Sequence, residues 1–255
     1  MAWPTLRREL DAWGANGRCA TLWWRDDDAI ADTPPLRRLL DLARDHGTPI
    51  ALAVIPATAD GAIARALQAD DRVCLIQHGW RHVNHAPAGA RKTEFAAARP
   101  VAEMVAELAA GHARLATLFP GRHRAVLVPP WNRLAETLPD RLAGIGLRAL
   151  SRHGARAQRW LAPQLQQVNT HLDPIAWRGD RGFIGEPAAI DLLVGHLQAR
   201  RGGRADVDEP TGLLTHHLVQ DTAGWHFVER LLTESRAHPA VRWIDLDESL
   251  KLSMP

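Results

Sequence analysis

The sequence predicts an α/β protein built around a parallel β-sheet, because short apolar runs alternate with amphipathic segments along the whole chain. The apolar runs are rich in Val, Ile and Leu and end at polar residues or prolines, as buried strands do. The segments between them repeat their apolar residues every three or four positions, which indicates helices. About seven or eight such alternations predict a parallel sheet that is either closed or doubly wound.

Each expected element follows from this pattern. The strands are expected near 19–25, 50–55, 73–77, 125–129, 147–150, 165–170, 212–215 and 241–245. The first helix is expected over 33–43, where Thr33 is followed by two prolines and then by leucines on one face. Further helices are expected over 100–118, 134–144, 187–199 and 222–236. Since no segment has the composition of a linker and no repeat is present, we expect one domain over 1–255.

The composition argues against several classes of protein. Hydrophobic residues make up 46% of the chain, enough for a real core rather than a disordered segment. The 31 basic and 29 acidic residues leave a net charge of +2, and no long run of like charge predicts a nucleic-acid surface. No segment approaches the roughly 20 apolar residues of a membrane span. The first residues also lack an apolar stretch of signal-peptide length, so a cytoplasmic location is expected.

Polar clusters fall where the expected strands end. The run Asp26-Asp27-Asp28 follows the first strand, His78 the third, Trp131 the fourth and the pair His216-His217 the seventh. A further cluster over 169–173 follows the sixth strand. In a parallel barrel these ends share one rim, which is where active sites are built.

Two of these clusters predict a metal site. His78 and His82 have the spacing H-x3-H, which can direct two imidazole nitrogens at one cation. Three adjacent carboxylates repel one another, so a cation is expected to offset their charge. Two histidines and one aspartate suit zinc and several other divalent metals. A second aspartate could act as a general base on water.

Taken in order, these motifs resemble the polysaccharide deacetylase family, also called the NodB-homology or family 4 carbohydrate esterase fold. The resemblance spans 19–217 and lies in the motifs Arg25-Asp-Asp-Asp-Ala29, His78-Gly-Trp-Arg-His82, Val128-Pro-Pro-Trp131, His171-Leu-Asp-Pro-Ile-Ala-Trp177 and Leu214-Thr-His216. It implies a distorted (β/α) barrel of about seven parallel strands. It also implies that Asp27 is the general base and that Asp28, His78 and His82 bind the metal. A shift of one residue, with Asp26 as base and Asp27 as ligand, stays open.

The resemblance assigns further residues to the reaction. Trp131, preceded by Pro130, takes the aromatic position whose backbone N–H helps to hold an oxyanion. His216 matches the general acid that protonates the leaving group, and His217 is a second candidate for that role. Asp173 is expected to orient the acid.

One departure from the family pattern affects the expected base. The arginine that positions the base in the family is replaced here by Val128. Arg25, next to the aspartate run, is our hypothesis for the missing positive charge. With no secretion signal expected, the chain is interpreted as a divergent cytoplasmic branch.

The resulting function is a metal-dependent deacetylase that removes the N-acetyl group of a sugar or polysaccharide precursor through metal-activated water. The metal is expected to be zinc and the partner an acetylated saccharide or sugar-containing small molecule. One alternative is a metal-dependent hydrolase of another non-peptide C–N bond, such as a cyclic amide. The other is a catalytically silent carbohydrate-binding scaffold.

Overall fold

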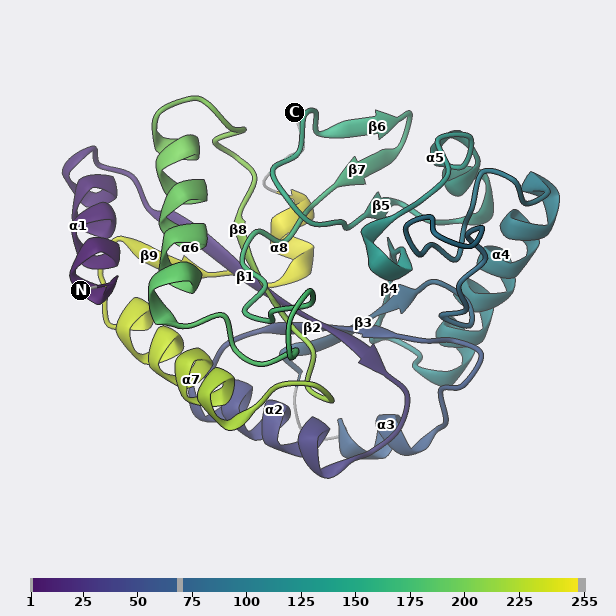
Figure 1. Cartoon of the computed structure of the whole chain (residues 1–255), viewed down its shortest axis with the longest axis horizontal. Coiled ribbons are helices and arrows are strands. Elements are labelled where there is room, and N and C mark those ends of the chain that lie inside the picture. The colour runs from purple at the N-terminus through teal and green to yellow at the C-terminus, as the bar shows by residue number, and fades with distance from the viewer. Residues whose placement is uncertain (1, 68–70, 252–255) are drawn as a thin grey trace.

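A parallel sheet forms the centre of the structure, a computed structural model that describes residues 2–67 and 71–251 (Figure 1). Its strands follow the order β6-β7-β5-β4-β3-β2-β1-β8, with β9 paired to β1. They are β1 (Ala20–Ala29), β2 (Ile50–Val54), β3 (Val73–His78), β4 (His123–Val128), β5 (Ala149–Leu150), β6 (Trp160–Ala162), β7 (Leu165–Gln167), β8 (Thr211–Thr215) and β9 (Val241–Trp243). Each expected strand has its counterpart; β6, an antiparallel partner of β7, was not predicted.

The segment that follows β7 closes the sheet. The backbone N–H groups of His171 and Leu172 donate to Gly212 O, and Leu214 N–H donates to Leu172 O. Residues beyond β7 therefore lie against β8, at the other end of the strand order. Within the described residues, β7, β5, β4, β3, β2, β1 and β8 form a closed ring of seven parallel strands, as expected.

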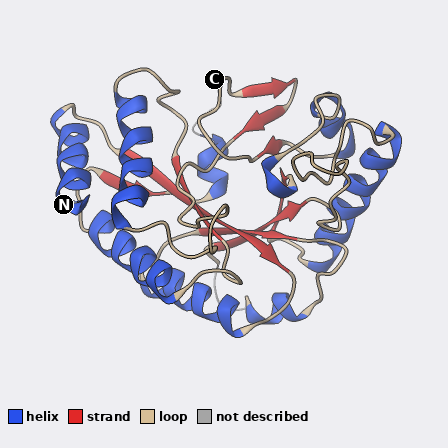
Figure 2. Ribbon diagram, in the orientation of Figure 1, coloured by secondary structure: helices blue, strands red, loops and turns tan. Residues whose placement is uncertain are grey.

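The helices lie mostly around the outside of this ring, with α8 near its centre in this view (Figure 2). They are α1 (Ala2–Ala15), α2 (Pro34–Asp45), α3 (Ala62–Ala66), α4 (Val101–Leu118), α5 (Pro139–Leu142), α6 (Glu186–Arg201), α7 (Thr222–Arg236) and α8 (Leu246–Lys251), with the 3₁₀ turns η1 (Pro130–Asn132) and η2 (Ala143–Ile145). The expected helix over 134–144 is shorter than predicted, and its place is taken by turns, α5 and η2. The helix α1 was not predicted. None of the described helices is long and apolar enough to cross a membrane.

Alternation along the strands separates an inner from an outer layer. Small or branched side chains, such as Ala51, Ala53 and Val126, pack with Trp23 in one cluster on the inner faces of the strands. The neighbouring Trp24 belongs to a different cluster, with leucines of α1, α2, α6 and α7. The first strand therefore presents Trp23, Arg25 and Asp27 to the interior, before its register shifts between Asp26 and Ala29.

Close approach at the closure of the ring requires glycine at position 212. A Cβ there would lie 2.5 Å from Trp23 Nε1 and 2.7 Å from both Asn169 O and Thr170 Cα. We expect Gly212→Ala to reduce the free energy of unfolding by about 1–3 kcal/mol, because backbone atoms must move. Gly195→Ala in α6 is the matched control: its Cβ would meet nothing within 4 Å, and alanine should stabilise that helix by about 0.5–1 kcal/mol. Equal urea midpoints for the two variants would contradict the close approach.

Candidate metal and catalytic site

The three consecutive aspartates point in different directions because they lie in the last part of the pleated strand β1, where its register shifts. Arg25 and Asp27, two residues apart, share the inner face. The Arg25 Nε donates to Asp27 Oδ1 at 2.8 Å, and a terminal guanidinium nitrogen donates to Oδ2 at 3.0 Å. Arg25 also donates to Ser151 Oγ at 2.7 Å and to Asn132 Oδ1 at 3.2 Å. The guanidinium is fully buried and fixes the Asp27 carboxylate in one orientation.

Asp26 faces the other side of β1 and is occupied by groups at the end of β8. Its Oδ2 accepts from Thr215 Oγ at 2.6 Å and from the His217 backbone N–H at 3.0 Å, while its Oδ1 lies 2.5 Å from His217 Nδ1. Burial lowers the pKa of His217, but the charge of Asp26 and its hydrogen bond raise this pKa by more, so the net shift is upward. Asp26 is therefore an internal partner of His217, and its carboxylate does not face the two histidines of the H-x3-H motif.

Asp28 turns out of the strand toward those two histidines. Its φ of 72° accompanies a register shift between β1 and β2, and both redirect the side chain. Asp28 Oδ1 lies 3.1 Å from His78 Nε2 and 3.4 Å from His82 Nε2. These three residues could hold one metal ion.

The ligand atoms of Asp28, His78 and His82 are arranged as a divalent metal ion requires. Asp28 Oδ1 is buried and makes no hydrogen bond with the described residues. The two nitrogen–oxygen separations match neighbouring ligands that are each bonded to a metal at about 2.1 Å. His78 Nδ1 lies 3.0 Å from Val128 O and donates to it, which leaves the Nε2 lone pair free toward Asp28.

The protonation of this group follows from burial and mutual charge. Burial raises the pKa of Asp28, but His78 and the other neighbouring histidines lower it more, so the net pKa lies below the usual value. Burial lowers the pKa of His78, which Asp27 and Asp28 raise above its usual value. Burial and the neighbouring His78 lower the pKa of His82. His82 is therefore neutral at neutral pH, the form that binds a metal.

Glu94, which sequence reasoning missed, holds the loop that carries His82. Its carboxylate accepts the backbone N–H groups of Trp80 at 3.0 Å, Arg81 at 2.6 Å and His82 at 3.1 Å. Glu94 is only 1% exposed, so these three bonds replace its hydration. The only sequence signal was an acidic residue beside Phe95 in an otherwise polar loop, which does not reveal a partner twelve to fourteen residues earlier.

Trp131 packs against the candidate metal ligands. Its ring centroid lies 4.4 Å from that of His82. Trp131 has φ 57° within η1, and its N–H belongs to the first turn, where no helical carbonyl accepts it. Pro130, before it, is buried and starts the turn. The expected aromatic position thus lies next to the metal ligands.

His216 also lies near the Asp27 carboxylate. Its Nε2 is 4.0 Å from Asp27 Oδ2, and the Trp177 ring meets it edge-on at a centroid distance of 4.7 Å. Asp173 does not hydrogen-bond to His216 as expected; its Oδ2 accepts from Trp177 Nε1 at 2.7 Å. The Nδ1 of His216 is buried without a hydrogen-bond partner among the described residues. Asp173 and His216 therefore both contact Trp177 and not each other.

A second buried group, His171, His196 and Glu209, also has the composition of a metal site. Here, however, the Gly212 backbone N–H donates to His171 Nδ1 at 2.9 Å, so the neutral ring carries its proton on Nε2. That nitrogen faces Glu209 Oε2 at 3.5 Å with a proton rather than a lone pair. Burial raises the pKa of Glu209, but His171 and His196 lower it to about 2. This group is a buried carboxylate with histidine partners, and the Asp28 group is the better metal site.

Comparison with solved structures confirms the expected fold. No family model matches the chain, and no curated protein matches its sequence. A structure from Mycobacterium smegmatis described as a polysaccharide deacetylase is similar with a TM-score of 0.60 and 17% identity, covering 91% of this chain and 90% of that one. A family 4 acetyl xylan esterase from Clostridium thermocellum, in complex with a cobalt ion, gives 0.56 and 14% over 91% of both chains. The peptidoglycan deacetylase PdaC from Bacillus subtilis gives 0.54 and 10% over 92% and 91%.

These similarities extend over about nine-tenths of each chain, so they concern the whole fold of the protein. The chain has the NodB-like barrel of the family 4 deacetylases, as its ordered motifs predicted. At identities of 10–17% the likeness concerns the fold alone. What the site does has to be argued from its own residues.

The Glu94 contacts generate a test of the metal site. Glu94→Gln keeps the side-chain volume but replaces one acceptor oxygen with a donor, so the His82 loop loses part of its support. We expect the dissociation constant for Zn²⁺ to rise about 10- to 100-fold, measured by competition with a chelating dye. Glu9→Gln, in α1, is the control, since Glu9 is similarly buried and its side chain is bonded, within the described part of the chain, to Arg201. An unchanged affinity for Zn²⁺ in Glu94→Gln would show that Glu94 does not support the metal site.

Proposed function

We propose that this protein is a metal-dependent deacetylase that hydrolyses the N-acetyl group of a saccharide. The observation that carries the proposal is the convergence of three groups on one rim of a deacetylase-type barrel. These groups are the Asp28–His78–His82 donor set, the Asp27 carboxylate oriented by Arg25, and the imidazole of His216. They supply a metal site, a base and an acid within a few ångströms of one another.

The metal site would be formed by Asp28, His78 and His82. A divalent ion such as Zn²⁺ held there would supply positive charge that makes a water molecule easier to deprotonate and an amide carbonyl easier to attack. Two nitrogen ligands and one oxygen ligand suit zinc and leave positions open for water and substrate.

The proton transfers would be carried out by residues on either side of this site. Asp27 takes a proton from the attacking water, and its salt bridge with Arg25 holds the carboxylate in one orientation. The backbone N–H of Trp131 stabilises the oxyanion that forms at the carbonyl. His216 gives a proton to the departing nitrogen as the C–N bond breaks. The oxygen of the water molecule is thus incorporated into acetate, and the amine leaves with the proton from His216.

Exposed aromatic surface beside His216 favours a sugar as the substrate. Trp177 is 43% exposed although its edge contacts His216 and its Nε1 is fixed by Asp173. An indole held in this way offers a rigid face on which the apolar side of a sugar ring can stack. Trp131, half-buried beside His82, provides a second aromatic surface close to the metal ligands.

The proposal is tested by acetate release. The protein, loaded with Zn²⁺ or Co²⁺, should release acetate from N-acetylglucosamine oligomers, and the chelated protein should not. Asp27→Asn should lower kcat by about 10²–10⁴-fold while retaining the metal, because the base is lost but the ligands stay. Asp26→Asn serves as the matched control, and acetate release should fall less there. Bound metal without acetate release from any acetylated saccharide would overturn the proposed activity and favour another C–N bond as the target.

The salt bridge inside the barrel gives a second test. Arg25→Ala leaves Asp27 without its two donors, and we expect kcat to fall about 10-fold or more with little change in metal content. Arg25→Lys should recover only part of this loss, since an ammonium cannot make the bidentate contact. The opposite result, with turnover unchanged in Arg25→Ala, would show that Arg25 does not take over the role of the arginine that Val128 replaces.

A further inference from the structure

Unpaired positive charge gathers on the loops around the candidate site. The loops that follow β3, β4, β5 and β7 carry eight basic residues for which no ion pair with a described carboxylate is found: Arg81, Arg91, Lys92, Arg133, Arg152, Arg159, Arg178 and Arg181. Because these strands are parallel, the four loops emerge at the rim that holds the site.

The carboxylates on the same loops do little to balance this charge. Glu94 is buried and accepts three backbone N–H groups. Asp173 accepts from Trp177 Nε1 and Ile175 N–H, and Asp180 accepts from Gly182 N–H. Glu136 is the remaining acidic residue on these loops, and it is exposed. These four loops therefore carry more cations than anions, and most of their anions already have partners.

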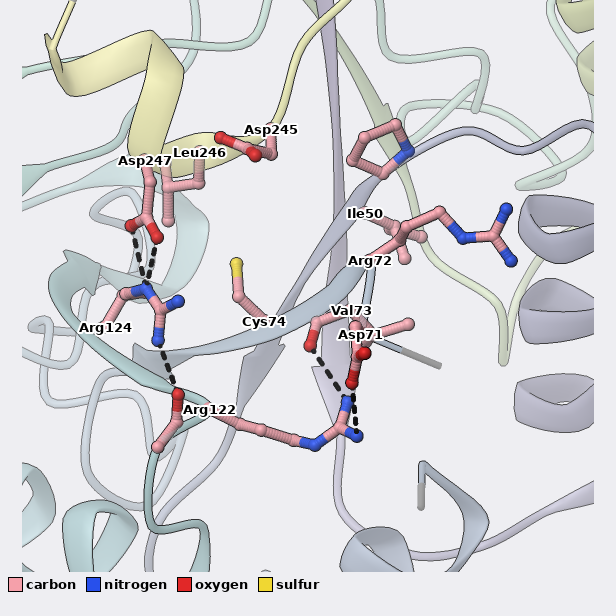
Figure 3. A pocket seen from close by; sticks show the side chains of 12 residues that line it. Ile50, Asp71, Arg72, Val73, Cys74, Arg122, Arg124, Asp245, Leu246 and Asp247 are labelled. Atoms are coloured by element: carbon pink, nitrogen blue, oxygen red, sulfur yellow. Dashed lines mark hydrogen bonds and ion pairs between the residues drawn. The ribbon is translucent and has the colours of Figure 1, made fainter. Parts of the chain in front are cut away.

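A pocket at the opposite end of the barrel offers a comparison. A pocket of about 370 Å³ opens there, between the starts of β2, β3 and β4 and the start of α8 (Figure 3). Its two arginines on β4 and the turn before it are matched with acids: Arg124 Nε lies 2.7 Å from Asp247 Oδ1, and Arg122 lies 3.7 Å from Asp71. Arg122 and Arg124 of this pocket are thus paired with acids, unlike the basic residues named above on the four loops around the site.

Three of the unpaired arginines lie close in sequence to the reacting groups. Arg81 is an exposed residue between His78 and His82, and its guanidinium lies over the Trp80 ring at 5.9 Å. Arg178 follows Trp177, whose edge contacts His216, and Arg181 lies in the same exposed loop. A substrate whose acetyl group reaches the metal ligands and whose ring lies on Trp177 passes between these two loops.

We infer that the substrate is an acetylated saccharide that carries an anionic group, a phosphate or a carboxylate, near the residue that is deacetylated. This inference rests on the proposed function. A neutral glycan would leave the excess of guanidinium groups without a use, whereas a phosphate or carboxylate accepts their paired N–H donors. The positive rim also attracts an anionic substrate over a distance of about 10 Å at moderate ionic strength.

The test compares three matched oligosaccharides: N-acetylchitotetraose, its 1-phosphate, and the same oligomer oxidised to a carboxylate at its reducing end. At low salt we expect kcat/KM for at least one anionic form to exceed that for the neutral form about 10-fold, with the preference shrinking as NaCl is raised. Comparing the two anionic forms identifies the group. Calorimetric binding of the same three compounds tests the charge preference even if none of them is hydrolysed, so failure of the inference is distinguishable from failure of the proposed activity.

Matched variants locate the preference. The triple variant Arg81→Gln/Arg178→Gln/Arg181→Gln should bring the anionic and neutral oligomers to within about 2-fold of each other. The control Arg8→Gln/Arg204→Gln/Arg236→Gln removes the same charge from exposed positions outside the four loops and should retain the preference. Equal binding of neutral and anionic oligomers by the wild-type protein would overturn the inference. A preference that survives the rim variant, or that is lost equally in the control, would overturn it as well.

Discussion

Three adjacent carboxylates at the end of a buried strand can coexist only if they are kept apart and each has its own partners. Like charges this close are costly in a partly buried setting. The pleat of β1 solves the problem by turning neighbouring side chains to opposite faces. Asp26 meets His217, Asp27 meets Arg25, and Asp28 faces His78 and His82. One short run of sequence thereby acquires three different environments.

These pairings also hold the rim together. Asp26 joins the end of β1 to the end of β8 through Thr215 and His217. Arg25 reaches across the barrel to Ser151 after β5 and to Asn132 in η1. Glu94 fixes the loop after β3, and His78 donates to Val128 O on β4. Residues from five strands or their loops are thus fixed relative to one another, which is the positioning that a catalytic site needs.

Much of this was predictable from the sequence because strand periodicity and motif order are local or nearly local signals. The ring of parallel strands, the H-x3-H pair and the position of Trp131 followed from them. The direction of each aspartate could have been deduced as well, since Arg25 and Asp27 have the spacing of residues on one strand face. That spacing favours Arg25 as the partner of Asp27. With Arg25 in this place, no arginine is needed at position 128, where the chain has a valine.

Other features depend on contacts that a sequence does not display. Glu94 serves a loop through three backbone donors, and no pattern in the residues marks a carboxylate for that purpose. Asp173 was expected to contact His216, but the turn after β7 places Trp177 between them. The short α5 replaces a predicted longer helix, and α1 was not predicted, because amphipathic spacing gives the type of an element more reliably than its length or its packing.

The separate uses of the three aspartates are tested most directly by locating the metal. A crystal of the protein grown with Zn²⁺ should show an anomalous peak at the zinc absorption edge that lies within about 2.2 Å of Asp28, His78 and His82. In that structure Asp26 should remain bonded to His217, and Asp27 to Arg25. A zinc peak bound to Asp26 or Asp27, or a peak at His171, His196 and Glu209 with none at Asp28, would contradict the account.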